Sequence, residues 1–188
     1  MVADEPTTAL DVTIQREVLA LIRELVAESN MALLFISHDL GVVAQTVRRL
    51  MVMYAGSVVE SGDTRDVFAR LAHPYTRALF AARPRLGLPR GSRLATIPGL
   101  VPELADLPAG CAFAERCGHV RPVCRASWPA LVDVAASAEA MPVPAGPETS
   151  TLGRSGAGSS ASSQGIDHQA RCLRLAELDQ DRAEVARG

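Results

Sequence analysis

Two sets of residues in this sequence have types and spacing that could support chemistry. Asp4 and Glu5 are adjacent carboxylates after a short apolar start, and His38 follows a later apolar run. Carboxylates at the end of a strand can hold Mg²⁺ and polarise a water molecule. An isolated Asp-Glu pair can equally be the acidic first turn of a helix. The second set is four cysteines, which thiolate chemistry makes candidate metal ligands.

The elements that must position the carboxylates and the histidine follow from hydrophobic periodicity. Apolar residues recur at helical spacing over 12–27, which predicts an amphipathic helix with Asp11 as its N-cap. The apolar run 31–36 has the length of a strand covered on both faces. Strand, helix and strand in this order predict a parallel pair. We therefore expect Asp4, Glu5 and His38 to lie at one edge of a sheet.

The chain beyond this unit continues as alternating strands and helices and then changes in texture. Hydrophobic patterning predicts a helix over 40–46, a strand over 49–54, its hairpin partner over 57–62, and helices over 64–71 and 75–82. From Pro84 onward, prolines and glycines predict an extended segment with little regular structure.

Composition excludes several classes of function. The 188 residues carry a net charge of -2, so there is no bulk electrostatic reason to bind nucleic acid. All 19 basic residues are arginine, and a phosphate loop of the G-x-x-x-x-G-K-[ST] type requires a lysine. No apolar run has the length of a membrane span and no secretion signal is evident, so we expect a cytoplasmic chain whose cysteines are reduced or bound to metal.

The cysteines are Cys111, Cys117, Cys124 and Cys172. The first three lie in a segment that has few aromatic residues and little core of its own, which favours a metal-ligand cage as a cross-link. Their spacing is wider than the C-x2-C pairs common in zinc sites. Reduced thiols, zinc and an iron-sulfur cluster all stay open at this point.

The segment Asp4-Glu5-Pro6-Thr7-Thr8-Ala9-Leu10-Asp11 resembles the Walker B motif and D-loop of ABC-transporter ATPases, and Ser37-His38-Asp39 resembles their switch histidine. The resemblance implies that Asp4 holds Mg²⁺ with ATP and that Glu5 is the general base for the attacking water. It implies that His38 contacts the γ-phosphate and that Asp11 reaches across a dimer of ATPase subunits. Thr8 stands where the family usually has serine, and keeps the hydroxyl.

A second set of motifs resembles the C-terminal extension of oligopeptide and dipeptide importer ATPases. These motifs are His73-Pro74-Tyr75-Thr76-Arg77-Ala78-Leu79, Ile97-Pro98-Gly99 and the segment from Leu107-Pro108 to Cys124. The resemblance implies a 4Fe-4S cluster held by Cys111, Cys117, Cys124 and Cys172, with zinc as the alternative metal. The implied cargo is a peptide or a related solute such as a nickel complex.

The expected fold class is α/β, with four regions. Residues 1–83 are expected to be the C-terminal part of a P-loop NTPase (ABC ATPase) sheet with its helices, and residues 84–135 an irregular cysteine-containing extension. Residues 136–167 are expected to be a disordered low-complexity insert, and residues 168–188 to carry the last cysteine and a C-terminal helix or tail.

The expected function is ATP hydrolysis that drives peptide import. The resemblance implies a second ATPase subunit, two membrane permeases and, indirectly, a solute-binding protein as partners, at the cytoplasmic face of the membrane. The family's phosphate loop and signature motif do not occur in this sequence, so we expect a truncated subunit that is inactive alone and exposes Ile14, Leu33, Leu34 and Phe35. The alternative is a non-catalytic metal-binding interaction module or a pseudogene product.

Overall fold

The computed structural model describes residues 1–83, 95–134 and 168–178. The chain divides into two compact units, Met1–Arg48 and Arg49–Gly188, which are described separately. The predicted disordered insert and most of the predicted C-terminal helix lie outside the described residues. No helix in the described ranges has the length and apolar character needed to cross a membrane.

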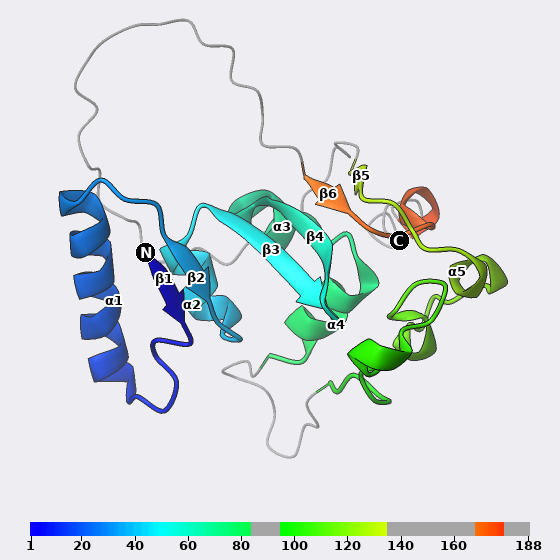
Figure 1. Cartoon of the computed structure of the whole chain (residues 1–188), viewed down its shortest axis with the longest axis horizontal. Coiled ribbons are helices and arrows are strands. Elements are labelled where there is room, and N and C mark those ends of the chain that lie inside the picture. Colours follow the sequence, from blue (N-terminus) through cyan, green and yellow to red (C-terminus); the bar gives the residue numbers. More distant parts are fainter. Residues whose placement is uncertain (84–94, 135–167, 179–188) are drawn as a thin grey trace, which may run out of the picture. The chain divides into compact units, whose positions relative to one another are not determined.

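The first unit is a strand-helix-strand-helix arrangement (Figure 1). Its elements are β1 Val2–Asp4, α1 Val12–Glu28, β2 Leu34–Ile36 and α2 Leu40–Thr46. Strands β1 and β2 are parallel, with Val2 opposite Leu34 and Asp4 opposite Ile36. The predicted parallel pair, the first helix and its Asp11 cap are therefore confirmed.

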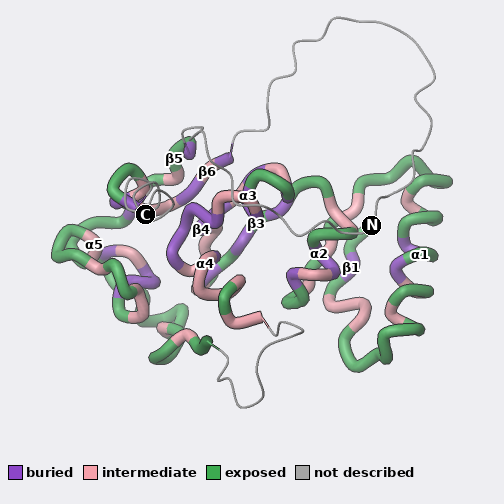
Figure 2. Tube along the Cα trace, turned by 180° about the vertical axis from the view of Figure 1, so that it is seen from behind, coloured by how far each residue is buried: buried purple, intermediate pink, exposed green. Residues whose placement is uncertain are grey.

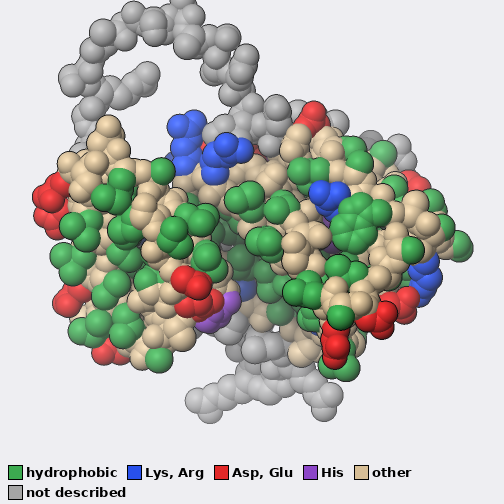
Figure 3. All heavy atoms as spheres, in the orientation of Figure 1, with side chains coloured by type: hydrophobic (Ala, Val, Ile, Leu, Met, Phe, Trp, Pro, Cys, Tyr) green, Lys and Arg blue, Asp and Glu red, His purple; other side chains and the backbone are tan. Residues whose placement is uncertain are grey.

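The apolar surface of the first unit is only partly buried. Leu19 and Ile22 of α1 are buried, whereas Ile14 is 41% exposed and Leu34 is 49% exposed. Leu33 and Phe35 are half-buried. The expected exposure is confirmed for Ile14 and Leu34, and the prediction of a strand covered on both faces is wrong because the face of β2 that carries Leu34 and Ile36 is exposed, at 49% and 44%. Hydrophobic side chains are visible over the α1 region in Figure 3.

The second unit begins with an antiparallel hairpin followed by two helices. Strand β3 Arg49–Tyr54 pairs with β4 Ser57–Asp63 across a short turn at Ala55 and Gly56. Helix α3 Thr64–Arg70 begins at Asp63, whose side chain accepts a hydrogen bond from the Arg65 amide. Helix α4 Pro74–Ala81 has His73 as its N-cap. The helices and strands predicted over 49–82 are confirmed.

The hairpin extends into a four-stranded sheet that sequence patterning did not predict. Strands β5 Val132–Asp133 and β6 Gln169–Ala170 complete an antiparallel sheet in the order β3-β4-β6-β5. Between the helices and β5 lie two 3₁₀ turns, Leu104–Asp106 and Ala114–Arg116, and the five-residue helix α5 Pro122–Ala126. The predicted α/β class is therefore confirmed as a mixture of helix and sheet.

The two units differ in how far their elements are buried (Figure 2). Alternate side chains of β3, at Leu50, Val52 and Tyr54, are buried, as period-2 patterning requires. In α1, by contrast, most of the tube is exposed. The predicted domain boundary near residue 83 stays a prediction.

Candidate functional site

The carboxyl ends of β1 and β2 bring the predicted carboxylates and histidine to one place. The Glu5 amide donates to the Ile36 carbonyl at 2.9 Å, so Glu5 lies beside the last residue of β2. His38 follows two residues later. Glu5 has a φ of 48°, an uncommon value for a residue with a side chain, which points to a tight turn directly after the strand.

The side chains of Glu5 and His38 are in contact. His38 Nδ1 lies 2.8 Å from Oε1 and 2.7 Å from Oε2 of Glu5, an arrangement in which Nδ1 carries the proton and donates it. The Thr8 hydroxyl donates to Glu5 Oε2. The carboxylate is therefore held from two sides, by the turn that follows it and by the strand beside it.

Both titratable groups of this pair have shifted pKa values. The hydrogen bond from Thr8, followed by that from His38, lowers the pKa of Glu5 below its usual value. The hydrogen bond to Glu5 and the charge of that carboxylate raise the pKa of His38. The ionised carboxylate is thus favoured at neutral pH, and the histidine remains protonated to a higher pH than a free imidazole.

The other two carboxylates predicted to function here have different surroundings. Asp4 is the last residue of β1 and is exposed, in register with Ile36. Asp11 accepts hydrogen bonds on Oδ1 from the Thr13 and Ile14 amides, both at 2.9 Å, and so caps α1. The structure therefore brings Glu5 and His38 into contact, sets Asp4 next to them in the chain and gives Asp11 a local structural task.

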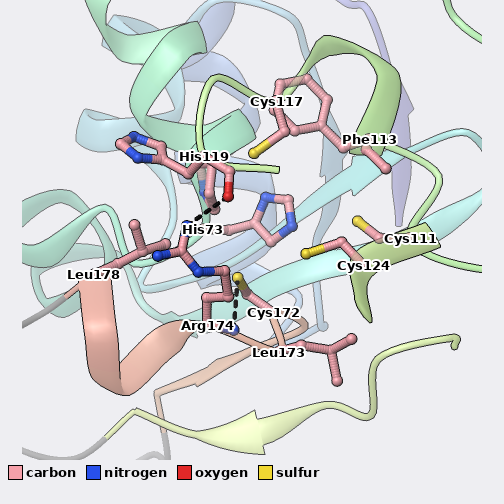
Figure 4. Close-up of a pocket in the computed structure, with 12 residues that line it drawn as sticks. His73, Cys111, Phe113, Cys117, His119, Cys124, Cys172, Leu173, Arg174 and Leu178 are labelled. Atoms are coloured by element: carbon pink, nitrogen blue, oxygen red, sulfur yellow. Dashed lines mark hydrogen bonds between the residues drawn. The ribbon is translucent and has the colours of Figure 1, made fainter. Parts of the chain in front are cut away.

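The second unit holds a cavity lined by all four cysteines (Figure 4). About 370 Å³ of space, part of it open to solvent, lies among Cys111, Cys117, Cys124 and Cys172. The cysteines are not joined by disulfides. Two separate segments, 111–124 and 172, therefore contribute cysteine side chains to a common space, and the metal-binding role predicted for them stays a prediction.

Backbone geometry holds the first three cysteines. The Cys111 amide donates to the Cys124 carbonyl at 2.8 Å, and the Ala114 amide donates to the Cys111 carbonyl at 2.9 Å. Gly110 lies against this crossing, where an added Cβ would stand 2.4 Å from the Cys124 carbonyl oxygen. Only glycine fits at this position without moving the backbone that carries Cys124.

Arg116 links the cysteine segment to the predicted Ile97-Pro98-Gly99 motif. Its guanidinium donates to the Pro98 carbonyl at 2.8 Å and the Ile97 carbonyl at 3.0 Å. A third bond, at 3.2 Å, goes to the Tyr54 hydroxyl at the end of β3. Arg116 therefore joins the cysteine segment and the Ile97-Pro98-Gly99 motif through hydrogen bonds.

Three of the four thiols that line the cavity are harder to ionise than a free cysteine. Burial raises the pKa of Cys111 and Cys117, and raises that of Cys172 to about 11. Within the described ranges, no group of three or more His, Cys, Asp or Glu side chains could hold a metal ion as the side chains stand. Binding a metal here would therefore release protons and draw the sulfur atoms into place.

Three charged or ionisable residues besides the cysteines also line the cavity: His73, His119 and Arg174. His73 is 1% exposed, and burial lowers its pKa to about 4, so its imidazole is neutral. Its Nδ1 accepts from the Tyr75 amide at 3.1 Å. Arg174 donates to the His119 carbonyl and to Glu177 Oε2, and its amide lies 3.5 Å from Cys172 Sγ.

Sequence reasoning missed Glu60, a fully buried carboxylate in β4, 0% exposed. Burial raises its pKa, but hydrogen bonds from His168 and from the backbone amides of His73 and Ala72 outweigh this effect, and the net pKa is lowered. The only signal in the sequence is an acidic residue within an apolar strand. The Nε2 of His168 lies 2.7 Å from Glu60 Oε1.

Comparisons with known proteins place these features in a family. Residues 59–124 match the model of the oligopeptide/dipeptide transporter C-terminal region. The chain is 52% identical over 139 residues to a putative peptide import ATP-binding protein of Brucella ovis, a match that covers 71% of the chain and 41% of the relative.

Two further relatives have transport functions in their names. The dipeptide transport ATP-binding protein of Escherichia coli is 49% identical over 131 residues, which cover 70% of the chain and 40% of that protein. The oligopeptide transport ATP-binding protein of Salmonella typhimurium is 48% identical over 129 residues, which cover 69% of the chain and 38% of that protein. The chain spans about two fifths of the length of these relatives. It belongs to the family of peptide import ATP-binding proteins and carries the C-terminal region of that family.

Proposed function

We propose that this chain supplies the hydrolytic carboxylate and histidine of an ATP-binding subunit that drives import of oligopeptides or dipeptides. The observation that carries the proposal is the contact of His38 Nδ1 with both carboxylate oxygens of Glu5, at 2.8 and 2.7 Å, beside the carboxyl ends of two parallel strands. In open α/β sheets, this edge is where nucleotides bind.

Glu5 acts as the general base in this proposal. Its lowered pKa keeps it ionised at neutral pH, so it can orient a water molecule and accept a proton as that water attacks the γ-phosphate. Phosphoryl transfer depends mainly on positioning and on charge stabilisation, with little covalent help from the protein. The bonds from Thr8 and His38 supply the positioning of Glu5, and protonated His38 supplies a positive charge next to it.

Asp4 and Asp11 have supporting roles. The exposed carboxylate of Asp4 is a hard oxygen donor of the kind that Mg²⁺ prefers, and the ion would neutralise phosphate charge when bound with ATP. Asp11 is proposed to contact a second ATPase subunit. Because Asp11 Oδ1 already accepts two backbone amides, this contact has to coexist with the cap of α1 or replace it.

The cysteine cavity is proposed to hold a 4Fe-4S cluster. Four sulfur donors around one space fit the ligand set of such a cluster, which would supply a rigid cross-link and a redox-active centre. Zinc is the alternative, but a zinc site needs four donors at roughly 2.3 Å from one ion. Each cysteine of a 4Fe-4S cluster binds a different iron, so the sulfurs do not have to converge on one point.

The remaining partners follow from the family. We propose two membrane permeases and a solute-binding protein, with the subunit at the cytoplasmic face of the membrane, and a peptide or a related solute such as a nickel complex as cargo.

A non-catalytic metal-binding module remains the alternative function, favoured by the fact that the family model covers 59–124 in the second unit and not the Glu5–His38 pair.

A chimaera tests the hydrolytic function. Residues of this chain replace the matching part of the Escherichia coli dipeptide transport ATP-binding protein, which is 49% identical over 131 residues. Phosphate release should be retained in the chimaera and fall about 100-fold or more with Glu5→Gln, the size expected for loss of a general base. Glu17→Gln, on the exposed side of α1, is the matched control. Turnover that survives Glu5→Gln supports the non-catalytic alternative.

A further inference from the structure

We propose that Glu60 and His168 form a clasp that positions Cys172 in the cysteine cavity. The clasp rests on the proposed cluster-binding role of that cavity and adds positioning residues to it. Neither residue lines the cavity itself. Both are buried, Glu60 at 0% exposure and His168 at 8%.

One carboxylate joins three segments of the chain. Glu60 Oε1 accepts from the Ala72 amide at 2.8 Å and lies 2.7 Å from His168 Nε2. Its Oε2 accepts from the His73 amide at 2.9 Å. Strand β4 is thereby tied both to the start of α4, where His73 faces the cavity, and to the segment that leads into Cys172 (Figure 4).

Cys172 follows a very short strand, which also pairs with Val132 and Asp133 of β5, and the Val134 amide donates to the His168 carbonyl at 2.6 Å. Strand β6 has two residues, Gln169 and Ala170, which pair with Ser61 and Glu60 of β4. A slip of one residue would turn alternate side chains to the opposite face. The Glu60–His168 contact opposes a slip because it fixes one side chain immediately before the strand, four positions ahead of the cysteine.

The structure leaves room for His168 at this position. An added Cβ on Gly62 would stand 3.2 Å from the His168 Cα and 3.4 Å from its Cβ, so a larger residue in β4 would push the histidine away. Between His168 and Cys172, Arg171 donates through its amide to the Val59 carbonyl at 2.8 Å and through Nε to the Val58 carbonyl at 3.0 Å. The segment that leads into Cys172 is therefore joined to β4 by the clasp and by Arg171.

Breaking the clasp should release the Cys172 segment without removing the cavity. Removing one member of a buried hydrogen-bonded pair leaves the other unsatisfied, which favours local opening of the segment that carries it. Cys111 and Cys124 should be less affected, because the Cys111 amide bond to the Cys124 carbonyl does not involve Glu60 or His168.

The first experiment uses the full, reduced, metal-free chain and follows alkylation of each cysteine by iodoacetamide with mass spectrometry. In Glu60→Gln and in His168→Leu, Cys172 should react about tenfold faster than in the unmodified chain, as local opening becomes easier, while Cys111 changes little. Asp133→Ala is the matched control, because it removes the exposed bond of 2.8 Å that Gln169 of β6 donates to Asp133, and it should leave the rate unchanged. Equal Cys172 rates with and without the clasp overturn the proposal.

The second experiment reads the metal site. After anaerobic reconstitution with iron and sulfide, the unmodified chain should hold about four irons, and Glu60→Gln should give the same three-iron electron paramagnetic resonance signal as Cys172→Ser. If the unmodified chain takes up no iron, the cluster proposal fails while the alkylation rates still decide the clasp. If Glu60→Gln unfolds the second unit, seen as a change in fluorescence of Trp128, His168→Leu decides. If both the iron content and the Cys172 alkylation rate of His168→Leu match those of the unmodified chain, the clasp is overturned.

Discussion

The Glu5–His38 pair and the cysteine cavity shift histidine pKa values in opposite directions. His38 is in contact with a carboxylate at the surface, and that contact raises its pKa. His73 lines the cavity at 1% exposure, and burial lowers its pKa to about 4. A charged partner therefore decides the protonation of the exposed histidine, whereas loss of solvent decides that of the buried one.

The two regions also differ in how they are assembled. Residues 33 positions apart on neighbouring parallel strands form the Glu5–His38 pair, which a short sequence pattern can anticipate. The cavity needs a segment 108 positions beyond Glu60 to be docked against β4. The Glu5–His38 pair comes from neighbouring elements and can therefore be exposed. The cysteine cavity comes from distant segments, so buried polar contacts are needed to hold those segments together.

The largest expected effect separates the two regions by activity. In the chimaera, Glu5→Gln should lower phosphate release about 100-fold or more, because the general base is lost, and should leave the iron content unchanged. Phosphate release and iron per chain are measured on the same preparation. A fall in the iron content of Glu5→Gln would mean that the Glu5–His38 pair and the cysteine cavity are coupled, and would contradict their treatment as independent regions.

Cys124→Ser should lower the iron content and leave phosphate release unchanged, the reverse of the effect of Glu5→Gln. Losing one of the proposed ligands should remove most of the visible absorption of the cluster, since a serine hydroxyl is a poor replacement for a thiolate. Ser127→Ala, at an exposed position three residues later, is the control. Unchanged absorption and iron content in Cys124→Ser would contradict the assignment of the cavity as the cluster site.

Gly110→Ala should destabilise the second unit by about 1–3 kcal/mol, the usual cost of forcing extra atoms into a packed site. The new Cβ would meet the Cys124 carbonyl oxygen at 2.4 Å. Urea unfolding is followed by the fluorescence of Trp128, the single tryptophan of the chain. Gly118→Ala is the control, because an added Cβ there meets nothing within 4 Å. Equal losses in both variants would contradict the crowding at Gly110.

The smallest expected effect concerns the pH dependence of the exposed pair. The raised pKa of His38 adds stability that is present below pH 6.5, the usual pKa of a histidine, and is lost as the pH rises through the raised pKa. The lowered pKa of Glu5 adds stability that is present above 4.5 and is lost as the pH falls through the lowered pKa. Both contributions are present between pH 4.5 and 6.5.

Nuclear magnetic resonance titration of the His38 ring protons measures this effect. Glu5→Gln should return the His38 midpoint toward that of a free histidine, and Thr8→Ala should change it less, because Thr8 bonds only to Glu5. Because the pair is exposed, solvent screening keeps its effect on stability small. A His38 midpoint that does not move in Glu5→Gln would mean that the contact is not populated in solution.

The sequence by itself determined the local elements and the motifs they carry. Helical spacing and the Asp11 cap predict α1, and an apolar run followed by Ser37-His38-Asp39 predicts a strand whose end faces Glu5. These features depend on residues close in the chain or on adjacent parallel strands, where periodicity and capping chemistry are sufficient.

Only the tertiary structure decided how the cavity is closed and where polar groups are buried. Strands β5 and β6 are two residues long, too short for periodicity to identify, and Glu60 has no local pattern that marks it as a buried carboxylate. The burial of Glu60 depends on bonds from the Ala72 and His73 amides and from His168, which come together only when distant segments pack. A carboxylate can be buried only where the folded chain supplies hydrogen bonds to it. Those hydrogen bonds come from segments that are distant in the sequence, so the sequence pattern alone does not reveal them.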